Sequence, residues 1–313
     1  HRSYEAVVTQ TGPVVAVALT EPRFRVNEIG RGNRFAGRVV GAVATFTLDE
    51  ATDAAIACAA GLVARASHAV ALTGAGLSVE SGIPPFRGPG GIWTKYGEPP
   101  MDGYQRFLRD PRGYWEERLA PKQKDWMRAL GEAVQNAKPN PGHEALALLE
   151  RRGLLAALIT QNIDDLHRQA GHQQLLEIHG NHRLLRCCEC NARFEPDAIA
   201  VDPQQLPPHC PHCAGVIKSD IVHFGEPIPP DVLRACFDAV ARTDVMIVVG
   251  TSATVYPAAE FPHEVLRQGG VVIEVNPEPS ELTPVATLSL RGPGAAVLTR
   301  LLDHVATSHE ARA

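Results

Sequence analysis

Four short apolar runs recur along the sequence beyond residue 49. They are Ala69–Leu72, Leu154–Ile159, Val245–Val249 and Val271–Val275, and they contain almost no polar side chains. Runs of this length are typical of strands buried on both faces, and helical patterns separate them. We therefore expect an α/β fold in which a parallel sheet lies between two layers of helices.

A short polar segment follows each apolar run. These segments are Thr73-Gly74, Thr160-Gln161-Asn162, Gly250-Thr251-Ser252 and Asn276. Ligands of open α/β sheets bind outside the carboxyl ends of the strands. The four segments are therefore predicted to line one nucleotide cleft.

The remaining pattern predicts helices and two departures from the helix-strand alternation. An alanine-rich helix over 49–66 precedes the first run, residues 101–135 form helical pieces broken at Pro111 and Pro121, and a helix runs from His143 to Arg151. A helical insertion is thus expected over about 89–142. Residues 1–48 are rich in Val and Thr around 14–19 and 38–46, which fits short strands or a loosely attached extension. An interaction segment and an incidental leader both remain open for this extension.

The segment after the first run, Thr73 to Gly88, reads TGAGLSVESGIPPFRG. Its first two glycines allow bare backbone to approach a phosphate closely. As a G-x-G-x-x-G fingerprint it is incomplete, because Val79 stands in the third glycine position. A plain tight turn would explain the glycines alone, but Phe86 and Arg87 nearby favour a loop over a charged, planar ligand.

Four of the seven cysteines form two C-x2-C pairs with 19 residues between them. They are Cys187, Cys190, Cys210 and Cys213. This spacing is typical of structural zinc, because four thiolates close the tetrahedron and leave no open position. A nucleic-acid-binding ribbon is the alternative use, and no basic cluster supports it. The module spans about 184–217 and has too few large apolar residues to fold on a core of its own.

Composition restricts the class of protein further. The chain has 313 residues, 44% hydrophobic and 21% charged, with a net charge of −5. These values are typical of a globular protein that binds neither nucleic acid nor membrane, since no apolar run approaches about 18 residues. The first residues lack a signal-peptide layout, so a cytoplasmic location is expected.

Together the motifs resemble the sirtuin family of NAD-dependent protein deacylases. The glycine segment is followed in order by TQNID at 160–164, His179-Gly180, the four cysteines, IVHFGE at 221–226, Gly250-Thr251-Ser252 and NPE at 276–278. The resemblance covers residues 49–306. It implies a Rossmann-like, doubly wound parallel sheet built from about 49–88, 143–183 and 218–306, which carries the helical insertion and the small four-cysteine zinc module, with 307–313 as a tail.

The resemblance also implies a reaction and its catalytic residues. The carbonyl oxygen of an acyl-lysine attacks C1′ of the nicotinamide ribose of NAD, nicotinamide leaves, and the acyl group passes through an alkylimidate to ADP-ribose. His179 matches the base that activates a ribose hydroxyl. Asn162 and Asp164 match the residues that hold the nicotinamide carboxamide and orient the ribose. Asp164 could equally cap the helix that starts near Leu166.

The other matched positions form a cofactor set and a substrate set. With Asn162 and Asp164, the cofactor set is Gly74, Ala75, Gly76, Ser78, Ile83, Phe86, Arg87, Gln161, Gly250, Thr251, Ser252, Asn276 and Glu278. The substrate set is Val222, Phe224, Gly225 and Val255, which would bind acyl-lysine proteins or peptides.

The sequence departs from the family pattern around the substrate. His223 stands where phenylalanine is usual, and Ala253-Thr254 replaces leucine plus an apolar residue, so the walls could admit other peptides or acyl groups. Tyr114 and Arg118 are four residues apart, whereas members that prefer acidic acyl groups carry a Tyr-x-x-Arg pair. Simple apolar acyl groups such as acetyl are therefore expected.

Three other classes of function compete with the deacylase. A non-catalytic NAD or ADP-ribose binding module would not need His179, Asn162 and Asp164 together. A mono-ADP-ribosyltransferase or NAD hydrolase would share the attack at C1′ and differ in the acceptor. A zinc-ribbon scaffold would not need the series of polar segments at the ends of the apolar runs.

Overall fold

Six parallel strands form the central sheet, in the spatial order β13-β12-β11-β5-β6-β7. The computed structural model describes residues 5–11, 14–20, 38–39, 44–45, 50–88, 90–120 and 125–310. The strands are β5 (Ala69–Thr73), β6 (Ala157–Thr160), β7 (Leu175–Glu177), β11 (Val245–Val249), β12 (Val271–Val275) and β13 (Leu288–Leu290). The chain winds outward from β5 to one edge and then from β11 to the other. The switch between the two halves, where ligands of such sheets bind, lies between β5 and β11.

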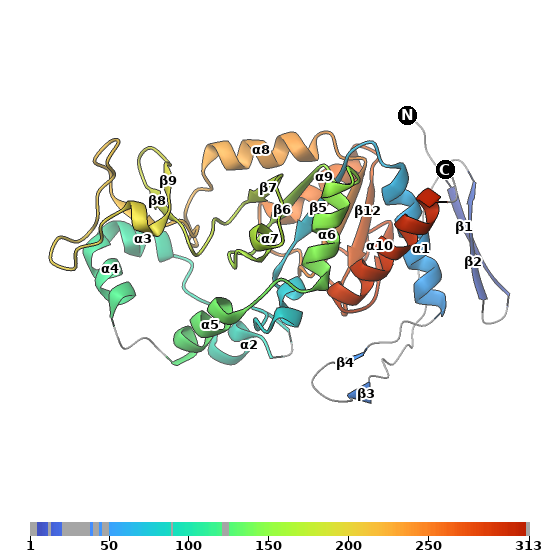
Figure 1. Ribbon diagram of the computed structural model, residues 1–313, viewed down its shortest axis with the longest axis horizontal. Helices are drawn as coiled ribbons and strands as arrows, with labels where there is room; N and C mark the ends of the chain where they lie inside the picture. Colours follow the sequence, from blue (N-terminus) through green and yellow to red (C-terminus); the bar gives the residue numbers. More distant parts are fainter. Residues whose placement is uncertain are drawn as a thin grey trace.

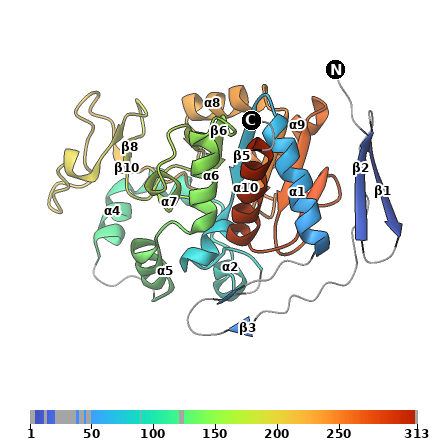
Figure 2. The same cartoon turned by 45° about the vertical axis from the view of Figure 1, so that its right-hand side comes forward.

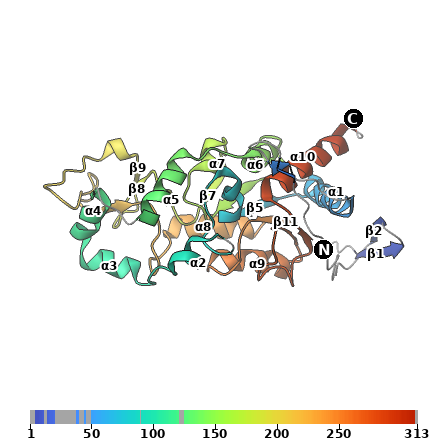
Figure 3. The same ribbon diagram turned by 90° about the horizontal axis from the view of Figure 1, so that it is seen from below.

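Helices cover both faces of this sheet, as the apolar runs predict (Figure 3). On one face lie α1 (Glu50–Arg65), α6 (Pro141–Arg151) and α10 (Gly294–Glu310), and on the other lie α8 (Pro230–Val240) and α9 (Phe261–Arg267). Successive strand residues point to opposite faces. In β11, Val245, Ile247 and Val249 accordingly join the first core and Met246 and Val248 the second. Burying side chains of this size contributes roughly 1.5–3 kcal/mol each.

The described residues of the helical insertion form four short helices. They are α2 (Ile92–Tyr96), α3 (Gly103–Arg109), α4 (Pro111–Leu119) and α5 (Asp125–Asn136). The break predicted at Pro111 is confirmed, because Pro111 opens α4 and the Asp110 carboxylate accepts from the Gly113 amide at 2.8 Å. The insertion connects back to the core through Asn140, whose side chain accepts from the first amides of α6.

A second, three-stranded sheet lies beside the insertion, at the opposite end of the molecule from α1 (Figure 1). It has the order β10-β8-β9 and consists of β8 (Leu185–Cys187), β9 (Arg193–Phe194) and β10 (Ile217–Ser219). Helix α4 packs on it through Trp115, which is buried and donates its indole N–H to the Ile217 carbonyl at 2.8 Å. This contact fixes the insertion to the small sheet.

Two strand pairs precede α1. Strands β1 (Glu5–Thr11) and β2 (Val14–Thr20) form an antiparallel hairpin beside α1, and β3 (Arg38–Val39) pairs with β4 (Ala44–Thr45) (Figure 2). Short strands, one of the two possibilities left open for these Val-rich and Thr-rich stretches, are therefore present. Within the part of the chain that the structure describes, no helix combines the length and the apolar character needed to cross a membrane.

Candidate functional site

One continuous cleft lies at the carboxyl ends of β5, β6, β11 and β12. Its walls come from the sheet loops and from the facing insertion. Of the residues predicted from the sequence, those that line it are Gly74, Ala75, Gly76, Phe86, Arg87, Gln161, Asn162, His179, Val222, Phe224, Gly225, Gly250, Thr251, Ser252, Val255, Asn276 and Glu278. Ser78, Ile83 and Asp164 are buried directly behind this surface.

The glycine segment packs against the loop that follows β11. The Gly76 amide donates to the Gly250 carbonyl at 2.8 Å, and the Gly74 amide donates to the Val249 carbonyl at 2.9 Å. A Cβ on Gly76 would lie 2.7 Å from the Gly250 Cα, so only glycine fits. The two loops thus meet backbone to backbone at the switch point of the sheet.

Asn162, Ser78 and Asp164 form a buried hydrogen-bonded chain next to this turn. The Asn162 amide group donates to the Gly74 carbonyl and to the Ser78 hydroxyl, each at 3.1 Å, and that hydroxyl donates to Asp164 Oδ2 at 2.6 Å. Burial raises the pKa of Asp164, and the Ser78 hydrogen bond opposes this effect. Asp164 Oδ1 also accepts from the backbone N–H of Leu166, the first residue of α7 (Leu166–Gln169), at 3.1 Å, although the N-cap position of this helix is Asp165.

His179 lies half-buried on the cleft wall, two residues after the end of β7. Its Nδ1 lies 3.1 Å from the Gln161 carbonyl oxygen. A carbonyl oxygen can only accept, so Nδ1 carries the proton and Nε2 of the neutral ring is left as the acceptor. Desolvation lowers the pKa of His179, and the Gln161 carbonyl partly offsets this. The neutral form is therefore favoured around pH 7.

Phe86 and Arg87 close one side of the cleft together with Trp93. The Phe86 ring lies 5.0 Å from Trp93, and the Arg87 guanidinium lies 4.4 Å from the centre of the same ring. Arg87 also pairs with Glu98 at 3.1 Å and donates to the Thr254 hydroxyl at 3.2 Å. The sequence analysis missed Trp93, although its place shortly after the Phe-Arg-Gly triplet is a usable signal.

The polar segments after β6, β11 and β12 contact one another at the other end of the cleft. Gln161 donates to the Thr251 hydroxyl at 3.1 Å, and the Asn276 side chain donates to the Thr251 carbonyl at 3.0 Å. Ser252 shares a hydrogen bond with Thr254 at 2.9 Å, and the Glu278 side chain is exposed. The predicted convergence of these segments is therefore observed.

The segment 221–226 forms the wall opposite the glycine segment. The Val222 amide donates to the His179 carbonyl at 3.0 Å, and the Phe224 ring lies 5.7 Å from Trp93. His223 instead packs among the rings of Phe107 and Tyr114. Burial, with help from Lys218 and Arg118, lowers the pKa of His223 to about 4, so this ring is neutral.

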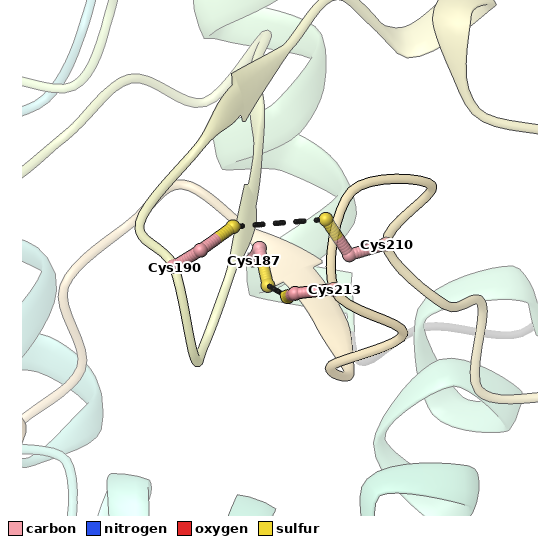
Figure 4. A group of neighbouring side chains, drawn as sticks. All are labelled: Cys187, Cys190, Cys210 and Cys213. Carbon is pink, nitrogen blue, oxygen red and sulfur yellow. Dashed lines mark hydrogen bonds between the residues drawn. The ribbon is translucent and has the colours of Figure 1, made fainter.

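The four predicted cysteine ligands point toward a common centre (Figure 4). Their sulfur atoms all lie within 4.8 Å of one another, with Cys187 and Cys213 at 3.4 Å and Cys190 and Cys210 at 3.7 Å. Backbone amides of Glu189 and His212 each donate to a sulfur at 3.4 Å, an arrangement that favours thiolates. The donor set and its spacing therefore fit a tetrahedral zinc ion.

A buried group of two hydroxyls and an imidazole lies beneath the cleft. Thr73 and Thr160 belong to segments predicted to line the cleft, but their side chains are buried and do not line it, and sequence reasoning missed their partner His167. The Thr73 and Thr160 hydroxyls, at the ends of β5 and β6, are 2.9 Å apart, and Thr73 is also 2.9 Å from Nε2 of His167. The Thr160 hydroxyl accepts a hydrogen bond from the backbone N–H of Asn162 at 3.1 Å. This group therefore supports the backbone of the Asn162 loop from below.

Comparison with known proteins adds independent evidence. The Sir2 family model matches residues 74–257. An NAD-dependent protein deacylase of Archaeoglobus fulgidus is 44% identical over 243 residues, which cover 78% of this chain and 95% of the relative. One from Pyrococcus furiosus is 42% identical, with the same shares covered.

Solved structures of similar proteins contain the relevant ligands. A mutant Sir2 homologue in complex with ADP-ribose aligns with a TM-score of 0.69 and 42% identity, covering 84% of this chain and 98% of that one. A Sir2 homologue in complex with NAD aligns with a TM-score of 0.67 and 43% identity, covering 80% and 94%. A Sir2 mutant with a deacetylated p53 peptide and 3′-O-acetyl ADP-ribose aligns with a TM-score of 0.63 and 35% identity, covering 78% of this chain and 96% of that one.

Proposed function

The chain belongs to the Sir2 family and is an NAD-dependent protein deacylase, in which we propose that His179 is the general base. The reaction consumes NAD, releases nicotinamide and transfers the acyl group from lysine to ADP-ribose. The observation that supports the assignment is the half-buried His179 on the cleft wall, with Nδ1 directed to the Gln161 carbonyl. Nε2 is then available to take a proton from a ribose hydroxyl.

Asn162 and Asp164 are proposed to fix the nicotinamide end of NAD. Because the Asn162 amide group is held by Gly74 and Ser78, its carbonyl oxygen is left to face a carboxamide donor. Asp164 supports this arrangement through Ser78 from behind the surface. Phe86, which lines the cleft, would exclude water from C1′, and Ile83 would support the wall of the nicotinamide pocket from behind the cleft surface.

Pyrophosphate and adenosine are proposed to bind at the two loops of the switch point. Backbone amides of the glycine segment and the hydroxyls of Thr251 and Ser252 suit phosphate and ribose oxygens. Asn276 and Glu278 would hold the adenosine ribose, and Arg87 would turn from Glu98 toward the phosphates. Its present ion pair is exposed and therefore weak.

The acyl-lysine peptide is proposed to lie between the segment containing Val222, Phe224 and Gly225 and the segment containing Val255. Both segments line the cleft that also contains His179. Zinc is proposed to bind Cys187, Cys190, Cys210 and Cys213, where it would stabilise the small sheet without taking part in the chemistry. We also propose that the catalytic domain has the boundaries predicted from the sequence and that the protein is located in the cytoplasm.

Mass spectrometry of an acetyl-lysine peptide tests these roles directly. The peptide is incubated with the protein, with and without NAD, and with His179→Ala. In the wild type, the peptide should lose its acetyl group and O-acetyl-ADP-ribose should appear only when NAD is present. In His179→Ala, the rate of deacetylation should fall at least ~100-fold, as expected for a lost general base. His263→Ala is the matched control, since His263 lies on α9 and does not line the cleft. Nicotinamide release without deacylation would instead indicate an NAD hydrolase or ADP-ribosyltransferase.

A further inference from the structure

A buried carboxylate lies in β12, directly beneath the loop that follows this strand. Glu274 is only 2% exposed in the middle of an otherwise apolar strand. Its oxygens accept hydrogen bonds from Ser280 at 2.5 Å, Thr283 at 2.8 Å and Ser289 at 2.8 Å. A buried carboxylate is tolerated only when it is paired and hydrogen-bonded, and these three hydroxyls belong to the loop and the neighbouring strand.

Arg291 supplies the positive charge that pairs with Glu274, and it also binds the loop after β12. Its Nη2 donates to Glu274 at 3.1 Å and to the Thr283 hydroxyl at 2.9 Å. Its Nη1 donates to the backbone carbonyls of Asn276 at 3.3 Å and Glu278 at 3.0 Å. One planar guanidinium therefore ties both ends of the segment 276–278 to the interior.

The segment held in this way presents the side chains proposed for the adenosine ribose. Asn276 and Glu278 line the cleft, whereas Glu274 and Arg291 do not. Asn276 in turn contacts the Thr251 carbonyl, so the position of 276–278 also affects the loop after β11.

We propose that Arg291, balanced by Glu274, is a positioning residue for the adenosine half of NAD. It fixes the backbone of 276–278 before the cofactor binds, so that little ordering remains to be done on binding. The inference rests on the proposed role of Asn276 and Glu278. It predicts an effect on NAD affinity and none on the chemical step.

Calorimetry with ADP-ribose and steady-state kinetics test this. Arg291→Gln is expected to raise the Kd of ADP-ribose and the KM of NAD roughly tenfold, as loss of charge-assisted hydrogen bonds predicts. The kcat at saturating NAD and the KM of the acyl-peptide should stay within about twofold. Arg291→Lys keeps the charge but not the fork, so an intermediate Kd is expected.

Arg267→Gln is the matched control. Arg267 also bridges two acidic side chains, Glu260 and Glu264, but it lies on α9 outside the cleft, so its loss should leave all four quantities unchanged. Glu274→Gln should reproduce the effect of Arg291→Gln, and the double variant should be no weaker than the worse single one.

Three results would overturn the proposal, and the first two separate it from the assignment on which it rests. If Asn276→Ala weakens ADP-ribose binding while Arg291→Gln does not, the positioning role alone is wrong. If both variants bind ADP-ribose like the wild type while the wild type deacylates the peptide, the assignment of Asn276 is wrong as well. A parallel fall of kcat and thermal midpoint in Arg291→Gln, without a change in Kd, would indicate a purely structural role.

Discussion

Burial sets the protonation of His179, and this has a measurable consequence. Because desolvation lowers its pKa below the ordinary 6.5, the ring stays neutral and able to accept a proton in mildly acidic solution. The acid limb of the pH profile of kcat/KM is therefore expected below pH 6.5, with activity lost only as the pH falls through this lower value. A limb above pH 6.5 would contradict the assignment, and His263→Asn should leave the limb in place.

A second titration concerns stability. Three buried histidines lie together: His143 is 4.7 Å from His167, which is 5.2 Å from His172, measured between ring centres. Burial lowers the pKa of all three, that of His143 to about 4. Glu150, bonded to His172, favours its charged form and offsets part of the effect there.

The direction in which pH changes stability follows from the pKa of histidine in the unfolded chain and its lower pKa in the folded protein. Unfolded histidine binds a proton near pH 6.5, so stability is full above 6.5 and is lost as the pH falls toward 4. For His143 alone the loss is on the order of 3 kcal/mol. Urea unfolding at pH 7.5 and pH 5.0 should show a smaller difference in His143→Gln than in the wild type. Equal differences would contradict the interpretation.

Local sequence signals explain which of these residues could be predicted. His179 follows a short apolar run directly, and Asn162 lies in the polar segment after the run Leu154–Ile159, so their positions at strand ends could be read from the pattern. Thr73 also follows an apolar run, but its contact with His167 has no local signal, because the two residues meet across 94 residues of chain. Likewise, Glu274 appears in the sequence only as one acid in an apolar run, and its partner Arg291 lies 17 residues away.

At the scale of elements, the close approach of two loops at the switch point depends on glycine. Gly76→Ala would place a methyl group 2.7 Å from the Gly250 backbone, so the loops must separate. We expect a loss of about 1–3 kcal/mol of stability and a higher KM for NAD, measured by denaturant unfolding and kinetics. Gly131→Ala is the control. Apart from the backbone of α5 itself, no described heavy atom lies within 4 Å of its added Cβ, so a gain of roughly 0.5–1 kcal/mol is expected. Equal effects of both changes would exclude the steric explanation.

Element boundaries were predicted less well than element types, for identifiable reasons. Only the last three residues of the apolar run Leu154–Ile159 belong to β6. The start of the run instead ends the preceding helix, because Gly153 adopts a left-handed conformation and the backbone N–H of Leu154 donates to the Leu149 carbonyl at the end of α6. Strand β13 was missed because Leu288–Leu290 has three residues at the sheet edge, one of them polar. The start of β6 and the short strand β13 leave too little trace in the apolar pattern to be recognised from the sequence alone.

At the scale of the whole molecule, buried ion pairs connect the small sheet to the segment that holds His179. Asp220 pairs with Arg186, next to the proposed zinc ligand Cys187, and with Arg193, each at 2.5 Å. Arg193 also pairs with Glu177 at 2.8 Å, two residues before His179, and Asp220 accepts from the Asn181 amide at 2.9 Å. The small sheet and His179, the proposed base, are therefore held by one network.

Removal of zinc is thus expected to reduce catalysis as well as stability. A chelator should release about one zinc ion per chain, and kcat should fall as β8 and β9 lose their fixed geometry. Asp220→Asn separates the network from the metal. Breaking a buried pair costs about 3–5 kcal/mol, so this variant should lose stability and kcat while its zinc content, measured by mass spectrometry, is retained. Asp53→Asn, which breaks an exposed pair with Arg300, should lose less than about 1 kcal/mol. If Asp220→Asn keeps full kcat, the zinc module acts on the active site by some route other than this network.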